Sequence, residues 1–477
     1  MTTTEAALMT TECSQSSFEF HCLNQRKVIA KFDGGNITSD AGILLLREVE
    51  KRTGLIAALA RCFSDYRDAR FVEHTVEELL AQRLFGMCLG YEDLNDHDRL
   101  RADPLLAVAA NKADPLGQDR RQESDRGKAL AGKSTLNRLE LAKKEGPDKY
   151  HKIQPHEAGI DSWMVDGFIQ AHERAPDEIV LDLDATDDLI HGNQEGRFFH
   201  GYYGNYCYLP LYIFSGDHLL CARLRPSNID GAEGTVEELM RIVRQIRQAW
   251  PNVRIIIRAD SGFCRDDLMT WCENNQVDYV LGLAKNERLK KQIVEELQQA
   301  EIQYHETQKP ARVFKDFRYQ TRTSWTRERR VVGKAEHMEK GANPRFVVTS
   351  LSAERMDARQ LYEEFYCARG NMENRIKEQQ LDMFADRTSA GTMRANQLRL
   401  YLSSAAYILM HALRRLGLKD TDLAHAQCQT IRLKLLKIGA QIRVTVRNIW
   451  ISLAGGYPYV EIFAAVFRNL QTVPMRT

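Results

Sequence analysis

Two apolar stretches, Glu178-Ile-Val-Leu-Asp-Leu-Asp184 and Val253-Arg-Ile-Ile-Ile-Arg-Ala-Asp260, each end on an aspartate and decide the fold. The first alternates, so Asp182 and Asp184 share one face of a strand and the leucines beside them lie on the other. The second is a nearly continuous apolar run, which is typical of a strand buried on both faces. A carboxylate at the end of a buried strand is costly unless it is paired or functional. The alternative is that each aspartate only caps the turn that follows it.

The stretches around these two strands predict an α/β fold. Further strands are expected at 207–214, 218–224 and 277–284, and helices at 235–250 and 265–275. The resulting order, β-β-β-α-β-α-β, is typical of a mixed sheet covered by helices. Such a sheet could hold the 178–184 and 253–260 strands side by side.

A predicted helix over 357–382 carries a stripe of polar side chains. At about 100° per residue, Tyr366, Arg369, Glu373 and Lys377 fall within about 80° of arc. A carboxylate, a phenol and two cations on one stripe suit the handling of a phosphate group and a metal ion. The alternative is an exposed face with ion pairs four residues apart, such as Glu373 with Lys377.

Taken together, three acids indicate a metal site. Mg²⁺ is held by a few carboxylates together with substrate phosphate oxygens. Asp184, Asp260 and Glu373 could supply these carboxylates. Two such ions about 4 Å apart serve an in-line phosphoryl transfer.

Several motifs support a family resemblance over about residues 28–465. They are Phe32-Asp-Gly-Gly-Asn-Ile-Thr-Ser-Asp-Ala-Gly, Leu84-Phe-Gly-Met-Cys-Leu-Gly-Tyr-Glu-Asp-Leu-Asn-Asp, Leu181-Asp-Leu-Asp-Ala-Thr, Arg329-Arg-Val-Val, and the spacing of Tyr366, Arg369 and Glu373. With the order of elements, they resemble the DDE transposases of bacterial insertion sequences, which have a ribonuclease-H-like core. The motifs also look like those of the insertion-sequence family numbered thirteen-eighty.

The resemblance implies roles for individual residues. Asp184, Asp260 and Glu373 would be the catalytic acids and would hold two Mg²⁺ ions, for which Mn²⁺ would substitute. Asp182 is the second choice for the first acid. Tyr366 and Arg369 would contact DNA phosphate.

One position departs from the family signature, which expects a lysine seven residues after the glutamate. Position 380 is Gln, while Lys377 lies on the same stripe and could supply the charge. Trp325, between two arginines, could stack on a base of the DNA, although a core tryptophan on a strand is the more common explanation.

The resemblance and the texture of the chain divide it into six segments. We expect a loose tail (1–27), a helical N-terminal DNA-binding region (28–150), the first part of the ribonuclease-H-like core (155–285), a β-containing insertion (286–352), the rest of the core with the catalytic helix (353–416), and a basic C-terminal region (417–477). Residues 411–477 carry ten Lys or Arg and three acids.

Composition excludes several classes of protein. The 477 residues are 43% hydrophobic and 27% charged, with a net charge of +1, which argues against disorder and against a polycationic coat. Ten scattered cysteines without a Cys-x-x-Cys pair argue against a zinc or disulfide framework. The chain shows no secretory signal and no apolar run long enough to span a membrane. We expect a cytoplasmic bacterial protein associated with the nucleoid.

The stretch Gly127-Lys-Ala-Leu-Ala-Gly-Lys-Ser134 matches the phosphate-binding loop pattern. The residues before it cannot form the buried strand that such a loop requires, and Ser134 would rather cap a helix over 134–144.

These observations favour a transposase that cleaves the ends of its own element and joins them to target DNA. Its partners would be double-stranded terminal repeats, target DNA and a second copy of the chain. The alternatives are a metal-dependent nuclease without strand transfer and a catalytically silent DNA-binding protein.

Overall fold

The computed structural model describes residues 17–141 and 146–475. It confirms a mixed α/β fold built on a large mixed sheet, with the order β11-β10-β6-β12-β13-β17-β15-β14 and β16 paired to β15. The strands of this sheet are β6 Glu178–Ala185, β10 Leu211–Ser215, β11 His218–Arg223, β12 Arg254–Ala259, β13 Asp278–Leu283, β14 Ala311–Tyr319, β15 Arg329–Met338, β16 Gly341–Ala342 and β17 Arg345–Thr349.

Strand β6 lies at the change of direction within the sheet. It pairs antiparallel with β10, where Asp184 lies opposite Tyr212, and parallel with β12, where Leu183 lies opposite Ala259. Strand β12 is also parallel to β13. The carboxyl ends of β6 and β12 therefore lie at the same edge of the sheet, and the pair Leu183–Ala259 directly precedes Asp184 and Asp260.

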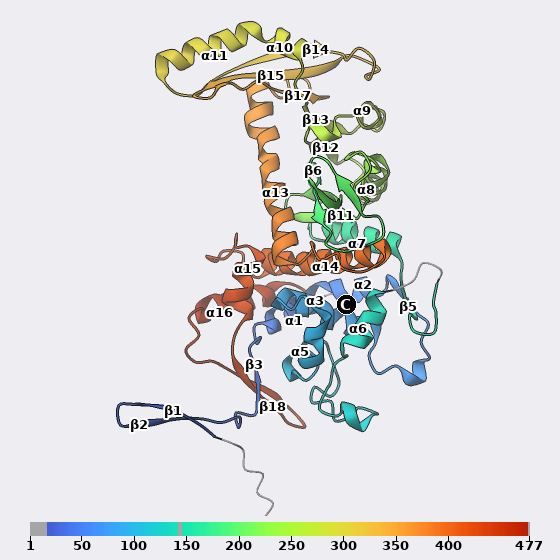
Figure 1. Ribbon diagram of the computed structural model, residues 1–477, viewed down its shortest axis with the longest axis vertical. Helices are drawn as coiled ribbons and strands as arrows, with labels where there is room; N and C mark the ends of the chain where they lie inside the picture. Colours follow the sequence, from blue (N-terminus) through green and yellow to red (C-terminus); the bar gives the residue numbers. More distant parts are fainter. Residues whose placement is uncertain (1–16, 142–145, 476–477) are drawn as a thin grey trace, which may run out of the picture.

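Helices cover both faces of this sheet (Figure 1). On one face α7 Glu157–Gln170, α8 Thr235–Ala249 and α9 Asp266–Asn274 share a core with the strands. Helix α8 buries Leu239, Ile242, Val243 and Ile246, the three- and four-residue spacing of an amphipathic helix. On the other face Leu361 and Tyr362 pack on valines and an isoleucine of the central strands.

The helical stretch on that second face was predicted as one helix over 357–382. It begins after Asp357, whose carboxylate accepts hydrogen bonds from the backbone N–H groups of Arg359 and Gln360. Its turns are not uniform, because wider π-type turns flank the central α-helix. The segments are α12 Ala358–Gln360, η5 Leu361–Tyr366, η6 Cys367–Arg369, α13 Gly370–Lys377 and η7 Glu378–Asp382.

A helical region lies beyond the carboxyl end of this stretch, across α14 Met393–Leu416 (Figure 1). Glu140 is fully buried there between Arg83 and Arg399. Its helices are α1 Ile43–Thr53, α2 Leu55–Ala60, α3 Val76–Leu89, α4 His97–Leu100, α5 Pro104–Ala109, α6 Lys133–Glu140, α15 Cys428–Ile431 with η8 Arg432–Leu436, and α16 Val460–Thr472; short 3₁₀ turns are η1 Ala69–Phe71, η2 Leu94–Asp96 and η3 Glu123–Asp125, with η4 Ser261–Phe263 in the core.

Two of the four small sheets, β3-β18-β19 and β4-β5, join distant parts of the chain. Strand β3 pairs with β18, so that Thr38 lies opposite Ala440, and Lys437 forms an ion pair of 2.6 Å with Asp40. The strands are β1 Phe18–Leu23 with β2 Arg26–Ala30, β3 Asn36–Thr38 with β18 Ala440–Val444 and β19 Ile449–Leu453, β4 Phe63–Asp65 with β5 Ile153–Pro155, and β7 Asp188–Leu189 with β8 Phe198–His200 and β9 Asn205–Tyr208.

Several local predictions differ from the structure. Residues 18–30 form an exposed hairpin, whereas 18–27 were expected in a loose tail; residues 1–16 lie outside the described residues. In the segment expected to be a β-containing insertion (286–352), β14 and β15 are antiparallel partners, with residues 320–328 between them. Helix α6 begins at Lys133 with Gly132 as its N-cap, so the prediction that Ser134 caps it is wrong; residues 142–145 of the expected 134–144 helix also lie outside the described part.

The elements after the core strands extend the same sheet. Helices α10 Glu287–Gln292 and α11 Val294–Thr307 lead into β14, and β17 pairs antiparallel with β13. In Figure 1, α11 lies across the outer surface of β14 and β15, at the end farthest from the N-terminal helices. None of the helices in the described ranges is long and apolar enough to cross a membrane.

Candidate active site

Three acids from separate parts of the sequence converge at the edge of the sheet. Asp184 lies at the end of β6, Asp260 follows the end of β12, and Glu373 lies on α13. The Arg369 guanidinium joins two of them, because its Nη2 donates to Glu373 Oε1 at 2.7 Å and its Nη1 lies 4.0 Å from Asp184 Oδ2. The structure therefore places Arg369 between Glu373 and Asp184, and Asp260 lies near enough for its charge to raise the pKa of Asp184.

Burial makes Asp184 hard to ionise in the absence of a cation. Desolvation raises the pKa of this carboxyl to about 7, and the negative charges of Asp260 and Glu373 add to the rise, while Arg369 opposes it. Asp260 is held differently, since its Oδ1 accepts a hydrogen bond of 2.8 Å from the backbone N–H of Gly262. This bond caps the short turn after β12, as the alternative interpretation of Asp260 supposed, and it leaves the other carboxylate oxygen for a further role.

Asp182, the second choice for the first acid, has a structural partner instead. It is 4% exposed and accepts two hydrogen bonds from Arg258 on β12, at 2.5 and 2.8 Å. Arg258 also donates to the backbone carbonyl of Phe365, next to Tyr366. This ion pair ties two strands to the helix that carries Arg369 and Glu373, and the sequence analysis missed it. The signal was present, because Arg258 interrupts an otherwise apolar strand.

Tyr366 lies against the backbone that carries Asp260. A Cβ atom added at Gly282 would be 2.5 Å from the Tyr366 hydroxyl oxygen and 2.9 Å from the backbone N of Ser261. Burial raises the pKa of the tyrosine, and Arg369 opposes the rise. A polar cavity of about 220 Å³ opens beside this contact, and its lining includes Lys285 and Arg345.

The two residues considered for the missing lysine of the signature lie in different surroundings. Lys377 is exposed, and none of the described residues forms an ion pair or hydrogen bond with its side chain. Gln380 is half-buried, and its Nε2 donates to the backbone carbonyl of Asp187, three residues after Asp184, at 3.2 Å. Gln380 thus contacts the segment that follows the first acid.

Trp325 is 6% exposed and belongs to the core beneath α9. Its ring packs edge-on against Tyr319 with centroids 5.8 Å apart, and the Arg329 guanidinium lies 5.6 Å from its centroid. This environment leaves no open ring face for a base, so the interpretation of Trp325 as a stacking platform is not supported and the core interpretation fits.

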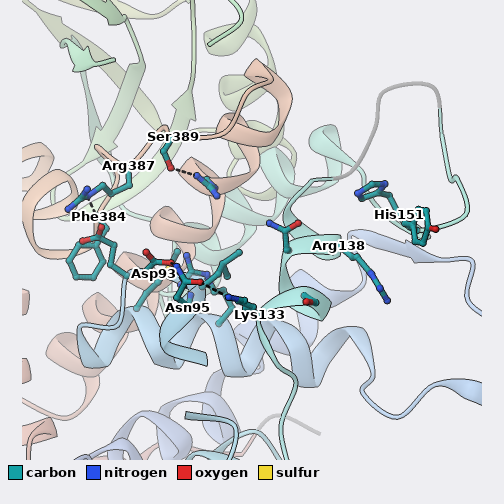
Figure 2. A pocket seen from close by; sticks show the side chains of 16 residues that line it. Asp93, Asn95, Lys133, Arg138, His151, Phe384, Arg387 and Ser389 are labelled. Atoms are coloured by element: carbon teal, nitrogen blue, oxygen red, sulfur yellow. Dashed lines mark hydrogen bonds and ion pairs between the residues drawn. The ribbon is translucent and has the colours of Figure 1, made fainter. Parts of the chain in front are cut away.

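A second hollow of about 650 Å³ lies among α3, α6 and the loop before α14 (Figure 2). It includes Lys133 and Ser134 of the stretch that matches a phosphate-binding loop. The backbone N–H of Lys133 donates to Asp98 at 3.0 Å, and residues 118–125 contain no strand, so the geometry of a phosphate loop is absent from this described segment. Most of the cationic side chains that line this hollow are paired with acids, for example Arg387 with Glu92 at 2.7 Å.

The chemistry of the three acids fits a divalent cation. Carboxylates are the ligands that Mg²⁺ prefers, and the charges of Asp260 and Glu373 both act on the buried Asp184 carboxyl, where they add to the effect of desolvation. Asp184, Asp260 and Glu373 would hold such an ion, with Arg369 as the nearest compensating charge. The arrangement is suited to a reaction at phosphorus, in which metal-bound and arginine-bound oxygens carry the negative charge.

Known proteins are similar to this chain in sequence family and, at low identity, in structure. The family model described as Transposase DDE domain group 1 matches residues 20–475. Among solved structures, the chain is similar to the piggyBac transposase in a cryo-EM synaptic complex with hairpin DNA, at 11% identity and a TM-score of 0.39 over 92% of this chain and 83% of that one. No curated protein matches the chain.

Proposed function

The chain belongs to the family of transposase DDE domains, and from this premise we propose that it cleaves the ends of its own DNA element and joins them to target DNA. The observation that carries the proposal is the convergence of Asp184, Asp260 and Glu373 around Arg369. Both strand ends and the helix are needed to form this site, so a chance cluster of surface acids is a poor explanation for it.

We propose that the core is ribonuclease-H-like. The sheet order β11-β10-β6-β12-β13, with three antiparallel strands followed by two parallel ones, supports this proposal. The helix with Glu373 then crosses one face of the sheet, while α7, α8 and α9 cover the other.

In this proposal the three acids hold two Mg²⁺ ions, and Mn²⁺ substitutes for them. The ions, when bound, activate the attacking oxygen and stabilise the leaving oxygen of the phosphodiester. The chain's own residues position the DNA: Arg369 binds a phosphate oxygen, and the Tyr366 hydroxyl donates a hydrogen bond to the same phosphate. Lys285 and Arg345, beside the small cavity next to Tyr366, add positive charge for the neighbouring phosphate.

The DNA would extend from this site over basic surfaces of the chain. We assign terminal-repeat binding to the N-terminal helical region (28–150), and backbone contacts to the inserted segment (286–352) and the basic C-terminal region (417–477). Two copies of the chain would bring two ends of the element together. The protein would act in the bacterial cytoplasm, at the nucleoid.

The test is cleavage of labelled DNA that carries the ends of the element, with Mg²⁺, by wild type, Glu373→Gln and Glu364→Gln. Glu364 is an exposed acid on the same helical stretch and is the matched control. We expect Glu373→Gln to lose at least about 10³-fold in cleavage rate and Glu364→Gln to resemble wild type.

The products decide among the remaining interpretations. Cleavage with joined products in wild type supports the transposase. Cleavage without joining identifies a nuclease, and binding of the ends without cleavage in Mg²⁺ or Mn²⁺ identifies a silent DNA-binding protein.

A further inference from the structure

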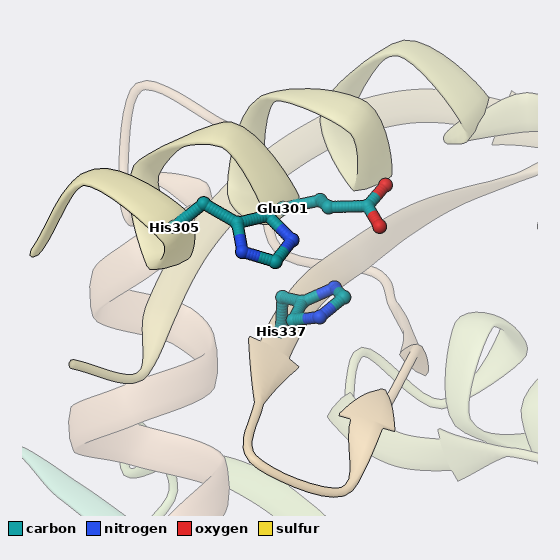
Figure 3. Close-up of side chains that lie close together, drawn as sticks. All are labelled: Glu301, His305 and His337. Atoms are coloured by element: carbon teal, nitrogen blue, oxygen red, sulfur yellow. The ribbon is translucent and has the colours of Figure 1, made fainter. Parts of the chain in front are cut away.

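A second group of metal-ligating side chains lies far from the three acids, on the outer layer of the sheet. Glu301 and His305, one helical turn apart on α11, face His337 on β15 (Figure 3). One ligand atom from each residue lies within 4.8 Å of the others. Helical spacing of four residues places the first two side chains on one face, and the strand supplies the third.

These side chains are not engaged elsewhere. Within the described residues, neither imidazole has a hydrogen-bond partner for its ring nitrogens, and Glu301 forms no ion pair. The two imidazole rings lie 5.9 Å apart between centroids, and the Tyr304 ring lies 5.1 Å from that of His337. The tyrosine holds the His337 ring beside the helix, with the nitrogens available.

From this geometry we propose that Glu301, His305 and His337 bind one divalent transition-metal ion. Zn²⁺ fits these ligands best. Two imidazoles and a carboxylate favour Zn²⁺, Co²⁺ or Ni²⁺ over Mg²⁺, which prefers oxygen ligands in octahedral geometry. Three protein ligands leave a fourth tetrahedral position for water. This site is separate from the acids of the active site and does not rest on the proposed function.

The ion would fasten the end of α11 to the sheet. The first half of the helix is held by an ion pair of 3.0 Å between Glu296 and Lys315 and by the buried Ala300. Its last two turns bury little, since Tyr304 alone among residues 301–307 is partly covered. A bond from His305 through the metal to His337 would replace the missing apolar contact.

The test is a Zn²⁺ titration of the metal-stripped full chain by calorimetry, together with the visible spectrum of the Co²⁺ form. Wild type and Asp260→Ala should each bind one ion at this site, with the absorption bands of low-coordinate Co²⁺. His305→Ala and His337→Ala should lose these bands and bind Zn²⁺ at least about 100-fold more weakly, because even an outer partner of a metal ligand is worth roughly 10–100-fold.

Glu306→Ala is the matched control, an exposed acid next to His305 that the site does not use. Because both histidines lie at the surface or half-buried, their substitution should leave the circular dichroism spectrum unchanged. Equal Zn²⁺ affinity of wild type and His337→Ala, or loss of the Co²⁺ bands in Asp260→Ala alone, would overturn the proposal.

Discussion

Asp182 and Asp184 lie two residues apart on one face of β6, yet their substitution should change stability in opposite directions. Asp182 neutralises the buried Arg258, so Asp182→Ala leaves that guanidinium without its partner. We expect a loss of about 3–5 kcal/mol in the free energy of unfolding, measured by urea denaturation. A loss below about 1 kcal/mol would show that Arg258 finds another partner or water.

Asp184→Asn should stabilise the metal-free protein at pH 8. In the folded wild type the pKa of the Asp184 carboxyl is about 7, above the ordinary value of 3.8, so the folded state favours the protonated form. Ionisation of Asp184 therefore lowers the stability as the pH rises from 3.8 to 7. Above pH 7 the cost is complete, at most about 4 kcal/mol, and asparagine removes it. Urea denaturation at pH 8 and pH 4 measures the effect, and a gain at pH 4 as large as that at pH 8 would refute it.

The same substitution should abolish the response to metal. On the proposed function, Mg²⁺ should bind the folded wild type and raise its unfolding midpoint, whereas Asp184→Asn should show little shift and no cleavage. A normal Mg²⁺ shift in the variant would place the ion elsewhere.

Gly282→Ala tests the close contact between β13 and Tyr366. The added methyl would clash with the tyrosine hydroxyl and with the backbone of Ser261, which cannot retreat without moving Asp260. We expect a loss of about 1–3 kcal/mol in stability and a loss of cleavage. Gly455→Ala, where an added Cβ meets nothing within 4 Å, is the control and should leave cleavage unchanged.

At the scale of elements, Glu378 fixes the end of the helical stretch to its neighbours. It is completely buried and contacts Arg414 on α14, Arg375 one turn earlier at 3.0 Å, and the backbone N–H of Cys428 on α15 at 2.6 Å. Glu378→Gln should lower the free energy of unfolding by about 3–5 kcal/mol, because Arg414 loses its buried counter-charge. Thermal unfolding beside Glu364→Gln checks this, and equal midpoints for the two variants would contradict it.

The helical stretch 358–382 also shows which features could be predicted from the sequence. The extent of the helix followed from periodicity, and the candidate acids followed from the ends of two apolar runs and from the family resemblance. That Arg369 lies between Asp184 and Glu373 depends on how the helix packs on the sheet, which no pattern in the sequence sets. The arithmetic of 100° per residue fails in the π-type turns 361–366 and 378–382, where the rotation per residue is smaller. For this reason the relative places of Lys377 and Gln380 could not be predicted.

Side-chain pairs between neighbouring strands of the sheet could not be predicted from the sequence either. The Asp182–Arg258 ion pair depends on the register of two strands separated by 70 residues or so, and no local pattern sets that register. Whether Trp325 was covered depended in the same way on α9, which packs over it in the fold.

At the scale of the whole molecule, buried histidines should make the protein sensitive to acid. Burial lowers the pKa of His74, His97 and His218 to about 3, and it lowers the pKa of His411 well below its ordinary value. These groups stay neutral in the folded state but bind a proton near pH 6.5 when unfolded, so their contribution to stability is present above pH 6.5 and is lost as the pH falls.

The expected loss between pH 6.5 and 5.5 is about 1 kcal/mol for each histidine. His218 faces Arg415 and His172, which oppose its protonation, and it lies beside His411. Urea denaturation of wild type and His218→Gln at the two pH values should show a smaller loss in the variant by about that amount. Parallel losses in the two proteins would indicate that this imidazole titrates normally.

The pairing of β3 with β18 has a consequence for synthesis. Residues 36–38 leave the ribosome some 400 residues before their partner strand at 440–442, and until then one edge of the N-terminal strand stays unpaired. Fragments released early therefore lack this closing contact and the Asp40–Lys437 ion pair with it. The helical region is complete only after residues 440–444 have been made, so that a product truncated before them lacks this strand and is exposed to proteases.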